Sequence, residues 1–278
     1  MAEYRELLSE GRRRLKEAGI ADVNTDAWLL LEHVSGLTRA QYFLRERDEV
    51  PVEVENRFRK LTEKRAGHAP LQYLIQEAWF YGRRFFVDES VLIPRQDTEV
   101  LVEEVLSRVK GQRGLRVLDM CTGSGCILIS LLAEMEDASG TGCDLSEKAL
   151  ETAKKNAETL EVEAEWIHSN LFSAIQDDYD IIVSNPPYIA SSVIEGLMEE
   201  VRDHEPRMAL DGREDGLYFY QKIVKEAYSH LRPGGLLAFE IGYDQREAVS
   251  DMMKEAGYLN VTAVRDLAGL DRVVLGSK

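Results

Sequence analysis

The chain has 278 residues, of which 44% are hydrophobic, and its 34 basic and 50 acidic side chains give a formal net charge of −16. This length suits one large domain or two ordinary ones, with enough apolar residues for a core. The apolar runs are far too short to cross a bilayer, and the glutamate-containing first twenty residues lack the apolar segment of a secretory signal. Three cysteines, an odd number, do not make a disulfide framework, so we expect a cytoplasmic protein.

The net negative charge comes entirely from the larger, C-terminal part of the chain. Residues 1–70 have 13 basic and 13 acidic side chains, whereas residues 71–278 have 21 basic and 37 acidic. Proteins gain most of their affinity for nucleic acid by neutralising phosphates, so this charge argues against a non-specific nucleic-acid binder. A basic cluster between Arg12 and Lys16 is typical of the solvated face of a helix.

Residues 1–70 are predicted to form a domain of four or five short helices, because apolar residues recur there at helical spacing. Residues 71–95 are predicted to be a linker between two domains. Aromatic and β-branched residues alternate between 77 and 93, which indicates a β-hairpin with its turn at Gly82-Arg83 and further extended chain at Val91–Ile93.

Residues 96–278 are predicted to form an α/β domain. A helix is expected from about Asp97 to Lys110, with Asp97 or Thr98 as its cap. Strand and helix patterns then alternate, which is typical of a mostly parallel sheet covered on both faces. The predicted strands are Arg116–Asp119, Thr141–Asp144, Glu165–Ser169, Asp180–Ser184, Leu236–Ile241, Leu259–Val264 and Arg272–Leu275, and the predicted helices lie at about 126–135, 146–159, 215–231 and 244–256.

A glycine-containing loop follows the first of these strands. Gly123 and Gly125 lack Cβ atoms, so the backbone can turn sharply and let a ligand lie against it. Asp144, 19 residues past Gly125, ends the next strand, where a carboxylate can accept hydrogen bonds from both hydroxyls of a ribose. The pair indicates a nucleoside cofactor rather than a bare βα turn. Leu128 stands where a dinucleotide fingerprint has its third glycine, which favours S-adenosylmethionine.

The motif Asn185-Pro186-Pro187-Tyr188 directly follows a predicted strand, and its two prolines hold the backbone stiff and extended. The Asn185 side chain and the Pro186 backbone supply carbonyls, which can converge on a planar NH₂ group, and Tyr188 supplies an aromatic face. Such acceptors return electron density to an amide nitrogen and orient it at a sulfonium methyl without a general base. The motif therefore predicts methyl transfer rather than a stiffened loop, with Asn185, Pro186 and Tyr188 catalytic and all four residues binding the substrate.

Three other groups of polar residues have simpler interpretations. Cys121, Cys126 and Cys143 lack the paired spacing of a zinc site, so we expect packing roles and no metal. Asp203-His204-Glu205 is interpreted as a polar loop rather than a base with an orienting carboxylate. Glu240, at the carboxyl end of a strand, is a second candidate for the site.

The chain resembles the bacterial release-factor glutamine N5-methyltransferases of the PrmC/HemK type along most of its length. The resemblance implies a Rossmann-like, seven-stranded S-adenosylmethionine-dependent methyltransferase sheet in residues 96–278, with S-adenosyl-L-homocysteine as product. It implies that the acceptor is the glutamine in the Gly-Gly-Gln loop of peptide-chain release factors 1 and 2, whose methylation modulates translation termination. The segments that carry the resemblance are Pro70–Leu74, Val91–Glu99, Leu118–Gly125, Asp144, Ser169–Phe172, Asn185–Tyr188, His204–Gly212 and Leu231–Gln245.

The resemblance also implies a set of cofactor-binding residues, and two of its positions depart from the family pattern. Cys121 stands where the family usually has glycine, and since cysteine does not readily adopt positive φ, we expect an ordinary backbone there. Asn170 replaces an acidic residue, and its amide can still accept from the adenine amine. The implied cofactor-binding residues are Cys121, Thr122, Gly123, Ser124, Gly125, Asp144, Asn170, Leu171 and Asn185.

The sequence leaves other functions open. A glutamine methyltransferase of a ribosomal protein would share the fold and the motif. A DNA adenine-N6 methyltransferase shares the motif, but the charge of −16 and the match at residues 91–99 argue against it. In a non-catalytic nucleotide-binding module, residues 185–188 would have no purpose. We expect a monomer that contacts neither membrane nor nucleic acid directly and docks its acceptor on residues 1–70.

Overall fold

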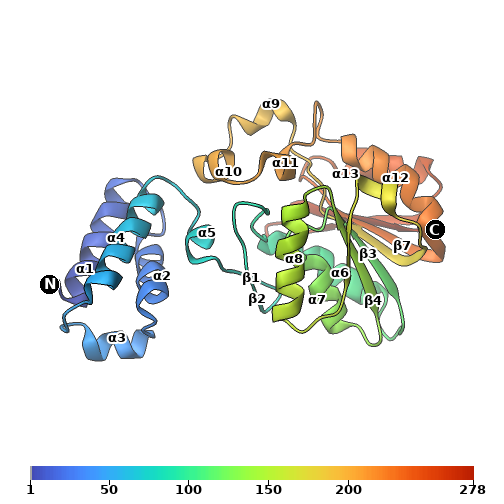
Figure 1. Cartoon of the computed structure of the whole chain (residues 1–278). Coiled ribbons are helices and arrows are strands. Elements are labelled where there is room, and N and C mark those ends of the chain that lie inside the picture. Colours follow the sequence, from blue (N-terminus) through green and yellow to red (C-terminus); the bar gives the residue numbers. More distant parts are fainter. Residues whose placement is uncertain (1) are drawn as a thin grey trace. The chain divides into compact units, whose positions relative to one another are not determined.

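The computed structural model describes residues 2–278, and the chain divides into two units (Figure 1). The first unit holds the chain up to Glu77 together with Met198–His204, and the second holds Ala78–Leu197 together with Glu205–Lys278. Of the helices within residues 2–278, none combines the length and the apolar character that crossing a membrane requires.

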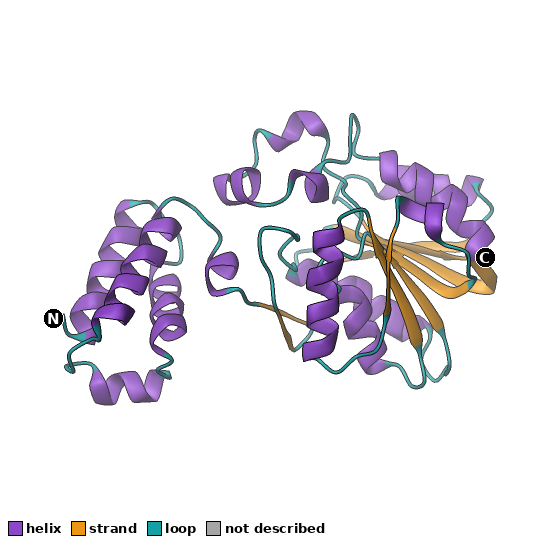
Figure 2. Cartoon of the chain, in the orientation of Figure 1, coloured by secondary structure: helices purple, strands orange, loops and turns teal. Residues whose placement is uncertain are grey.

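The first unit is helical, as predicted (Figure 2). Its core is made by apolar side chains spaced along the helices, such as Leu7, Leu15 and Trp28. Gly11 lets two helices approach closely, since a Cβ there would lie 2.5 Å from the Phe58 ring. The helices are α1 (Tyr4–Glu17), α2 (Val23–Ser35), α3 (Arg39–Arg45), α4 (Val52–Ala66), α5 (Leu71–Ile75) and, from much later in the chain, α10 (Glu199–His204).

An arginine buried in α4 joins α10 to the other helices of this unit. The guanidinium of Arg65 lies 2.6 Å from Asp26 Oδ2 and 2.7 Å from Glu200 Oε1. The Arg65 and Asp26 side chains are each 7% exposed, so removing one partner would leave a buried charge uncompensated. The ion pair between Arg65 and Glu200 therefore joins α10 to the helical unit, although 120 residues of the second unit separate α10 from the rest of the first unit in the sequence.

The second unit is built around the predicted seven-stranded sheet, which within residues 2–278 has the order β5-β4-β3-β6-β7-β9-β8. β3 is an inner strand that pairs in parallel with β4 and β6, while β9 runs antiparallel between β7 and β8. The strands are β3 (Arg116–Met120), β4 (Ser139–Asp144), β5 (Glu165–His168), β6 (Tyr179–Ser184), β7 (Leu231–Glu240), β8 (Leu259–Arg265) and β9 (Asp271–Ser277).

Both faces of the sheet are covered by helices (Figures 1 and 2). Successive strand residues point to opposite faces, so Val117 of β3 joins one apolar cluster and Leu118 joins the other. The first cluster includes apolar residues of α6 and α7, and the second includes those of α12 and α13. The main helices are α6 (Glu99–Arg108), α7 (Cys126–Glu134), α8 (Glu147–Thr159), α12 (Tyr218–His230) and α13 (Arg246–Glu255).

The predicted hairpin is present, but its turn is shifted. β1 (Ala78–Phe80) pairs antiparallel with β2 (Arg83–Phe85), and Phe80 faces Arg83, so the turn is Tyr81-Gly82. The left-handed backbone of both turn residues explains the shift, since it matches the twist of a two-residue hairpin. Val91–Ile93 adds no strand, and leads instead to η1 (Gln96–Thr98) and α6.

Two features escaped the sequence patterns. β7 begins at Leu231, five residues before its predicted start, because Pro233-Gly234-Gly235 lies in a region where the register with β6 shifts. Short helical segments also went unpredicted, because one or two turns carry too little periodicity. They are η1, η2 (Leu171–Ala174), α9 (Ser191–Ile194), α10 and α11 (Arg207–Leu210).

Asp119, the second-last residue of β3, is a buried acid. Its side chain is 0% exposed, and its Oδ2 accepts a 2.6 Å hydrogen bond from the hydroxyl of Thr122. Burial raises the pKa of the Asp119 carboxyl to about 7, although the Thr122 bond opposes this shift. The carboxyl group therefore titrates near neutral pH.

Replacing Asp119 by asparagine should flatten part of the pH dependence of stability. The folded-state pKa of about 7 exceeds the unfolded value of about 4, so between these pH values folded Asp119 keeps a proton that the unfolded chain releases. Stability is therefore lost as pH rises through this window. Urea unfolding at pH 5 and pH 8 should show the wild type losing about 2–3 kcal/mol more than Asp119→Asn. Equal losses in the two proteins would contradict the raised pKa.

Candidate active site

The carboxyl ends of β3, β4 and β6 lie together at one edge of the sheet. Met120, which ends β3, pairs with Cys143 of β4 and with Ser184 of β6. Ligands of open α/β sheets bind outside this edge. The register therefore brings the loop after Met120, the carboxylate of Asp144 and the side chain of Asn185 together, although they are far apart in the sequence.

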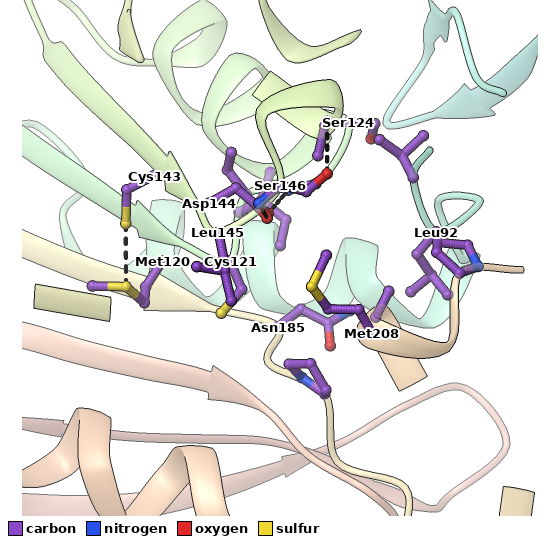
Figure 3. Close-up of a pocket in the computed structure, with 18 of the residues that line it drawn as sticks. Leu92, Met120, Cys121, Ser124, Cys143, Asp144, Leu145, Ser146, Asn185 and Met208 are labelled. Atoms are coloured by element: carbon purple, nitrogen blue, oxygen red, sulfur yellow. Dashed lines mark hydrogen bonds between the residues drawn. The ribbon is translucent and has the colours of Figure 1, made fainter. Parts of the chain in front are cut away.

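These loops line a pocket of about 990 Å³, a volume that includes the solvent at its mouth. Figure 3 shows Asp144 and Ser146 above Asn185 and Met208 in this pocket. The sequence-predicted site residues that line it are Cys121, Thr122, Gly123, Ser124, Asp144, Asn170, Leu171, Asn185 and Pro187.

In the loop after β3, a non-glycine residue adopts the left-handed backbone conformation as well as the glycines. Gly123 has a φ of 54°, and Cys121 has a φ of 63°, so the prediction of an ordinary backbone at Cys121 is wrong. The next residue explains the conformation. The Thr122 N–H donates to the carbonyl of Cys143 at 3.0 Å, and its hydroxyl donates to Asp119. These two bonds hold the loop in a turn that costs Cys121 on the order of 1–2 kcal/mol.

Gly125 lies behind the pocket and is not part of its wall. With a φ of 78° it begins α7, and a Cβ there would lie 3.1 Å from Trp166 of β5. Gly142 of β4 has the same neighbour, since its Cβ would lie 2.4 Å from the Trp166 ring. In this structure, both glycines allow close packing around one tryptophan.

Asp144 is held by backbone donors. Its Oδ2 accepts from the N–H of Gly123 and its Oδ1 from the N–H of Ser146, both at 2.9 Å. Burial raises the pKa of the Asp144 carboxyl, and these bonds oppose the shift. Because each carboxylate oxygen can accept a further hydrogen bond, the group can still bind two ligand hydroxyls.

The loop after β5 contributes Asn170 and Leu171 to the pocket. Leu171 has a φ of 52°, a conformation that non-glycine residues rarely adopt. The hydroxyl of Ser169 donates to the Leu171 carbonyl and accepts from the N–H of Ala174, which holds the turn. Asn170 is exposed, so its amide is available to a ligand at the pocket wall.

Asn185 follows β6, and hydrogen bonds of Ser184 and of its own side chain hold it in place. The hydroxyl of Ser184 donates to the Met120 carbonyl at 2.6 Å, which ties the end of β6 to β3. The side-chain nitrogen of Asn185 donates to Thr98 Oγ1 at 3.4 Å. The amide oxygen of Asn185 therefore remains an available acceptor. Pro186 is buried and is not part of the pocket wall.

Tyr188 points its hydroxyl at Glu240, away from solvent. The Tyr188 hydroxyl donates to Glu240 Oε1 at 3.2 Å, and burial raises the pKa of both side chains. The Tyr188 carbonyl accepts from Gln245 Nε2 at 2.9 Å, and Gly216 packs so closely that a Cβ there would lie 2.3 Å from this carbonyl oxygen. Tyr188 is thus fixed beside the pocket without forming part of its wall.

Sequence reasoning missed several residues of the pocket wall. The segment before α6 lines the pocket through Leu92, Arg95 and Thr98, although the sequence suggested only a linker there. Met208 lines it too, three residues after Glu205, a buried side chain that pairs with the exposed guanidinium of Arg95. The sequence of this segment has proline and apolar residues without periodicity. Such a pattern predicts an irregular segment, but it does not predict that the segment lies against the pocket.

The other polar candidates do not form a second site. His204 contacts the Gly67 carbonyl at the end of α10, and Asp203 pairs with Arg202, so they make no base–carboxylate pair. Cys143 packs against Met120, with its sulfur 3.2 Å from the thioether. Over residues 2–278, no group of histidine, cysteine and acidic side chains is arranged to hold a metal ion.

Comparison with known proteins shows which family and fold the chain shares. Residues 6–75 match the family model of the PrmC N-terminal domain, and residues 96–202 match that of the methyltransferase small domain. The 16S rRNA methyltransferase of T. thermophilus, solved in complex with AdoMet and guanosine, matches with a TM-score of 0.51 and 20% identity, covering 73% of this chain and 49% of that one. At this identity the likeness shows the fold alone.

Two full-length relatives give a closer match. The chain is 42% identical over 268 residues to the release factor glutamine methyltransferase of Caulobacter vibrioides, covering 95% of this chain and 93% of that protein. It is 38% identical over 285 residues to the enzyme of the same name from Clostridium botulinum, covering 99% of both. The chain belongs to the release factor glutamine methyltransferase family.

Proposed function

We propose that this protein transfers a methyl group from S-adenosylmethionine to the side-chain amide nitrogen, N5, of the glutamine in the Gly-Gly-Gln motif of peptide-chain release factors. The names of its relatives support this acceptor class. The observation that carries the proposal is that Asn185, an amide acceptor on a stiff Pro-Pro backbone, lines the same pocket as Asp144 and the glycine loop. Groups suited to a nucleoside and to an amide thus share one cavity.

The pocket residues fit S-adenosylmethionine. Asp144 presents a carboxylate that two backbone N–H groups already orient, which suits the two hydroxyls of a ribose. Leu145, Ala149 and Leu171 add apolar wall for an adenine ring, and Asn170 adds an amide acceptor for its amine. The loop from Cys121 to Ser124 lines the methionine side. When bound, the cofactor supplies a methyl group on a cationic sulfonium.

Catalysis rests on orienting the acceptor amide. The side-chain carbonyl of Asn185, which lines the pocket, accepts a hydrogen bond from one N–H of the glutamine amide. The backbone carbonyl of Pro186, which is not part of the pocket wall before the acceptor binds, is proposed to accept from the other N–H, and the two bonds return electron density to the nitrogen. No base is required before attack, so the contribution of the site is position and preorganised dipoles. The Tyr188 hydroxyl is bonded to Glu240, so only the aromatic face is left for the acceptor, which has to reach it beside the pocket.

The helical unit is proposed to dock the release factor. On α3, Phe43 is 67% exposed and Leu44 is 86% exposed, and adjacent large apolar side chains in water are typical of protein-binding surfaces. The unit has no net charge over residues 1–70, in contrast to the acidic remainder. An acceptor protein can therefore approach it without strong electrostatic repulsion.

The test of the proposed function is an acceptor comparison. The protein is incubated with radiolabelled S-adenosylmethionine and, separately, with release factor, ribosomal proteins and DNA. Label should enter release factor and should be absent from a release factor whose Gly-Gly-Gln glutamine is replaced by alanine. Label that enters only ribosomal protein or DNA would overturn the proposal in favour of that acceptor.

Asp144→Ala should weaken S-adenosylmethionine binding. The change removes a charged acceptor, and each hydrogen bond to a charged group is worth on the order of 1.5–3 kcal/mol. Isothermal titration calorimetry measures the affinity, and Glu158→Ala, an exposed acidic residue on α8, is the matched control. Equal affinity of Asp144→Ala and the control would remove Asp144 from the binding site.

Asn185→Ala should lower the methylation rate even when the cofactor is saturating. By analogy with the loss of one preorganised oxyanion-hole group, kcat should fall about 10²–10³-fold, or roughly 2.7–4 kcal/mol. Asn185→Asp should be impaired as well, because its charge changes the hydrogen bonding of the site. Single-turnover methylation of release factor with saturating cofactor is the measurement, with Asn260→Ala as control. Full activity of Asn185→Ala would mean that residues 185–188 are structural.

Replacing both Phe43 and Leu44 by serine should raise KM for release factor by about three- to tenfold and leave kcat unchanged, because an apolar contact is lost in the unit that holds none of the pocket residues. Steady-state kinetics at varied concentrations of release factor measures KM and kcat separately. Leu267→Ser removes an equally exposed leucine from the β8–β9 turn and serves as control. An unchanged KM in the double variant argues against docking on α3.

A further inference from the structure

Gln245 is a buried residue whose side chain hydrogen bonds to three separate stretches of backbone around the acceptor motif. It is 9% exposed and directly precedes α13. Its Nε2 donates to the Tyr188 carbonyl at 2.9 Å and to the Gly216 carbonyl at 3.2 Å, and its Oε1 accepts from the N–H of Gly242 at 2.9 Å. These bonds use both donors of the amide, and a flipped amide would set its oxygen against two carbonyls. The three contacts therefore fix the direction of this side chain.

The backbone from Asn185 to Pro187 is a stiff segment. The rings of Pro186 and Pro187 fix φ at both positions. Asn185 and Pro186 each precede a proline, which confines them to extended backbone. The segment therefore has little freedom of its own, and the residues at its two ends decide where the Pro186 carbonyl points.

Both ends of this stiff segment are held by hydrogen bonds. Before it, the hydroxyl of Ser184 donates at 2.6 Å to the carbonyl that ends β3. After it, the Tyr188 carbonyl accepts the bond from Gln245. The N–H of the same peptide, that of Ile189, donates to the Leu210 carbonyl at 3.0 Å. The peptide between Tyr188 and Ile189 is thus held from both sides, and Gln245 supplies one of the two bonds.

Gly216 shows how closely this peptide is confined. A Cβ on Gly216 would lie 2.3 Å from the Tyr188 carbonyl oxygen and 2.7 Å from Gln245 Nε2. A Cβ on Gly212 would lie 2.8 Å from the Tyr188 α carbon. All three distances are too short for real carbon contacts, so the bond from Gln245 to Tyr188 forms only because two glycines leave room for it.

We propose that Gln245 is a positioning residue, which holds the Tyr188 carbonyl and thereby aims the Pro186 carbonyl at the acceptor amide. This inference rests on the proposed function, in which the Pro186 carbonyl accepts one of the two amide N–H bonds. Without its donor, the Tyr188 carbonyl is left unsatisfied, and the peptide turns to find another partner. The stiff segment carries that turn to Pro186, because its other end stays fixed at Ser184. Gln245 itself touches no substrate.

The first test uses Gln245→Met, which keeps the length of the side chain and loses its donors. The variant should lower kcat for release factor about tenfold, while KM and the affinity for S-adenosylmethionine stay within about twofold of wild type. The value of kcat is referred to the concentration of sites that bind S-adenosylmethionine in calorimetry, so unfolded protein is not counted.

Tyr258→Phe is the matched control for Gln245→Met. It removes a buried hydroxyl of the same unit that donates to the Val224 carbonyl at 3.1 Å, so it also loses one bond from a side chain to the backbone. Its kcat should stay within about twofold of wild type. A wild-type kcat in Gln245→Met overturns the inference. So does a loss no larger than that of the control, or a loss that appears only in KM.

A second variant, Gly216→Ala, disturbs the same carbonyl while Gln245 remains in place. Its Cβ pushes against the Tyr188 oxygen, so kcat should again fall about tenfold. Gly111→Ala is the control, because Gly111 has a φ of 81°, close to the 75° of Gly216, and the space where its Cβ would lie is open. It places similar backbone strain away from Tyr188 and should keep kcat within about twofold of wild type. Equal kcat values in the two glycine variants overturn the inference.

A readout without acceptor separates this inference from the proposed function. In an HNCO spectrum the Ile189 N–H is correlated with the Tyr188 carbonyl carbon, whose chemical shift depends on the hydrogen bond that the carbonyl accepts. This resonance should shift in Gln245→Met and stay at its wild-type position in Tyr258→Phe. An unchanged resonance in Gln245→Met overturns the inference whatever the acceptor is. Absence of label in release factor, by contrast, overturns only the proposed function.

Discussion

Parallel pairing of β3 with β4 and β6 is the constraint on which the whole site depends. It aligns Met120 with Cys143 on one side and with Ser184 on the other, so three loops leave the sheet at the same edge. The strands can pair this way because β3 is buried on both faces, with Val117 and Leu118 each 0% exposed. A slip of one residue would turn these side chains to the wrong faces and separate the glycine loop from the Asn185 motif.

Beneath this edge, the site is supported by buried polar groups that a purely apolar core would not need. Asp119 holds Thr122 under the glycine loop, and Glu240 receives the hydroxyl of Tyr188. Burying such groups costs stability, as the raised pKa of each carboxyl indicates. In return, these bonds hold the polar groups of irregular loops in fixed directions. Fixed directions matter for a reaction whose catalysis rests on orientation rather than proton transfer.

Backbone strain is also present at the pocket, although most non-glycine residues with positive φ in the described chain lie elsewhere. Cys121 and Leu171, two non-glycine residues with positive φ, both line the pocket. Each conformation persists because neighbouring hydrogen bonds over-determine it: those of Thr122 at one loop and of Ser169 at the other. The two strained residues bring backbone close to the space that a bound cofactor would occupy, which is where a close approach is useful.

Local information in the chain was enough for the order and type of the main elements, because periodic burial on a strand or helix is written in neighbouring residues. It was also enough to place Asp144 and Asn185 at the pocket, since Asp144 ends a clearly predicted strand and Asn185 directly follows another. The place of Arg95 in the pocket and the membership of α10 in the helical unit arose from contacts between segments 110 and 135 residues apart. The left-handed backbone of Cys121 belongs with these, because the bond from Thr122 to β4 imposes a conformation that its own side chain disfavours.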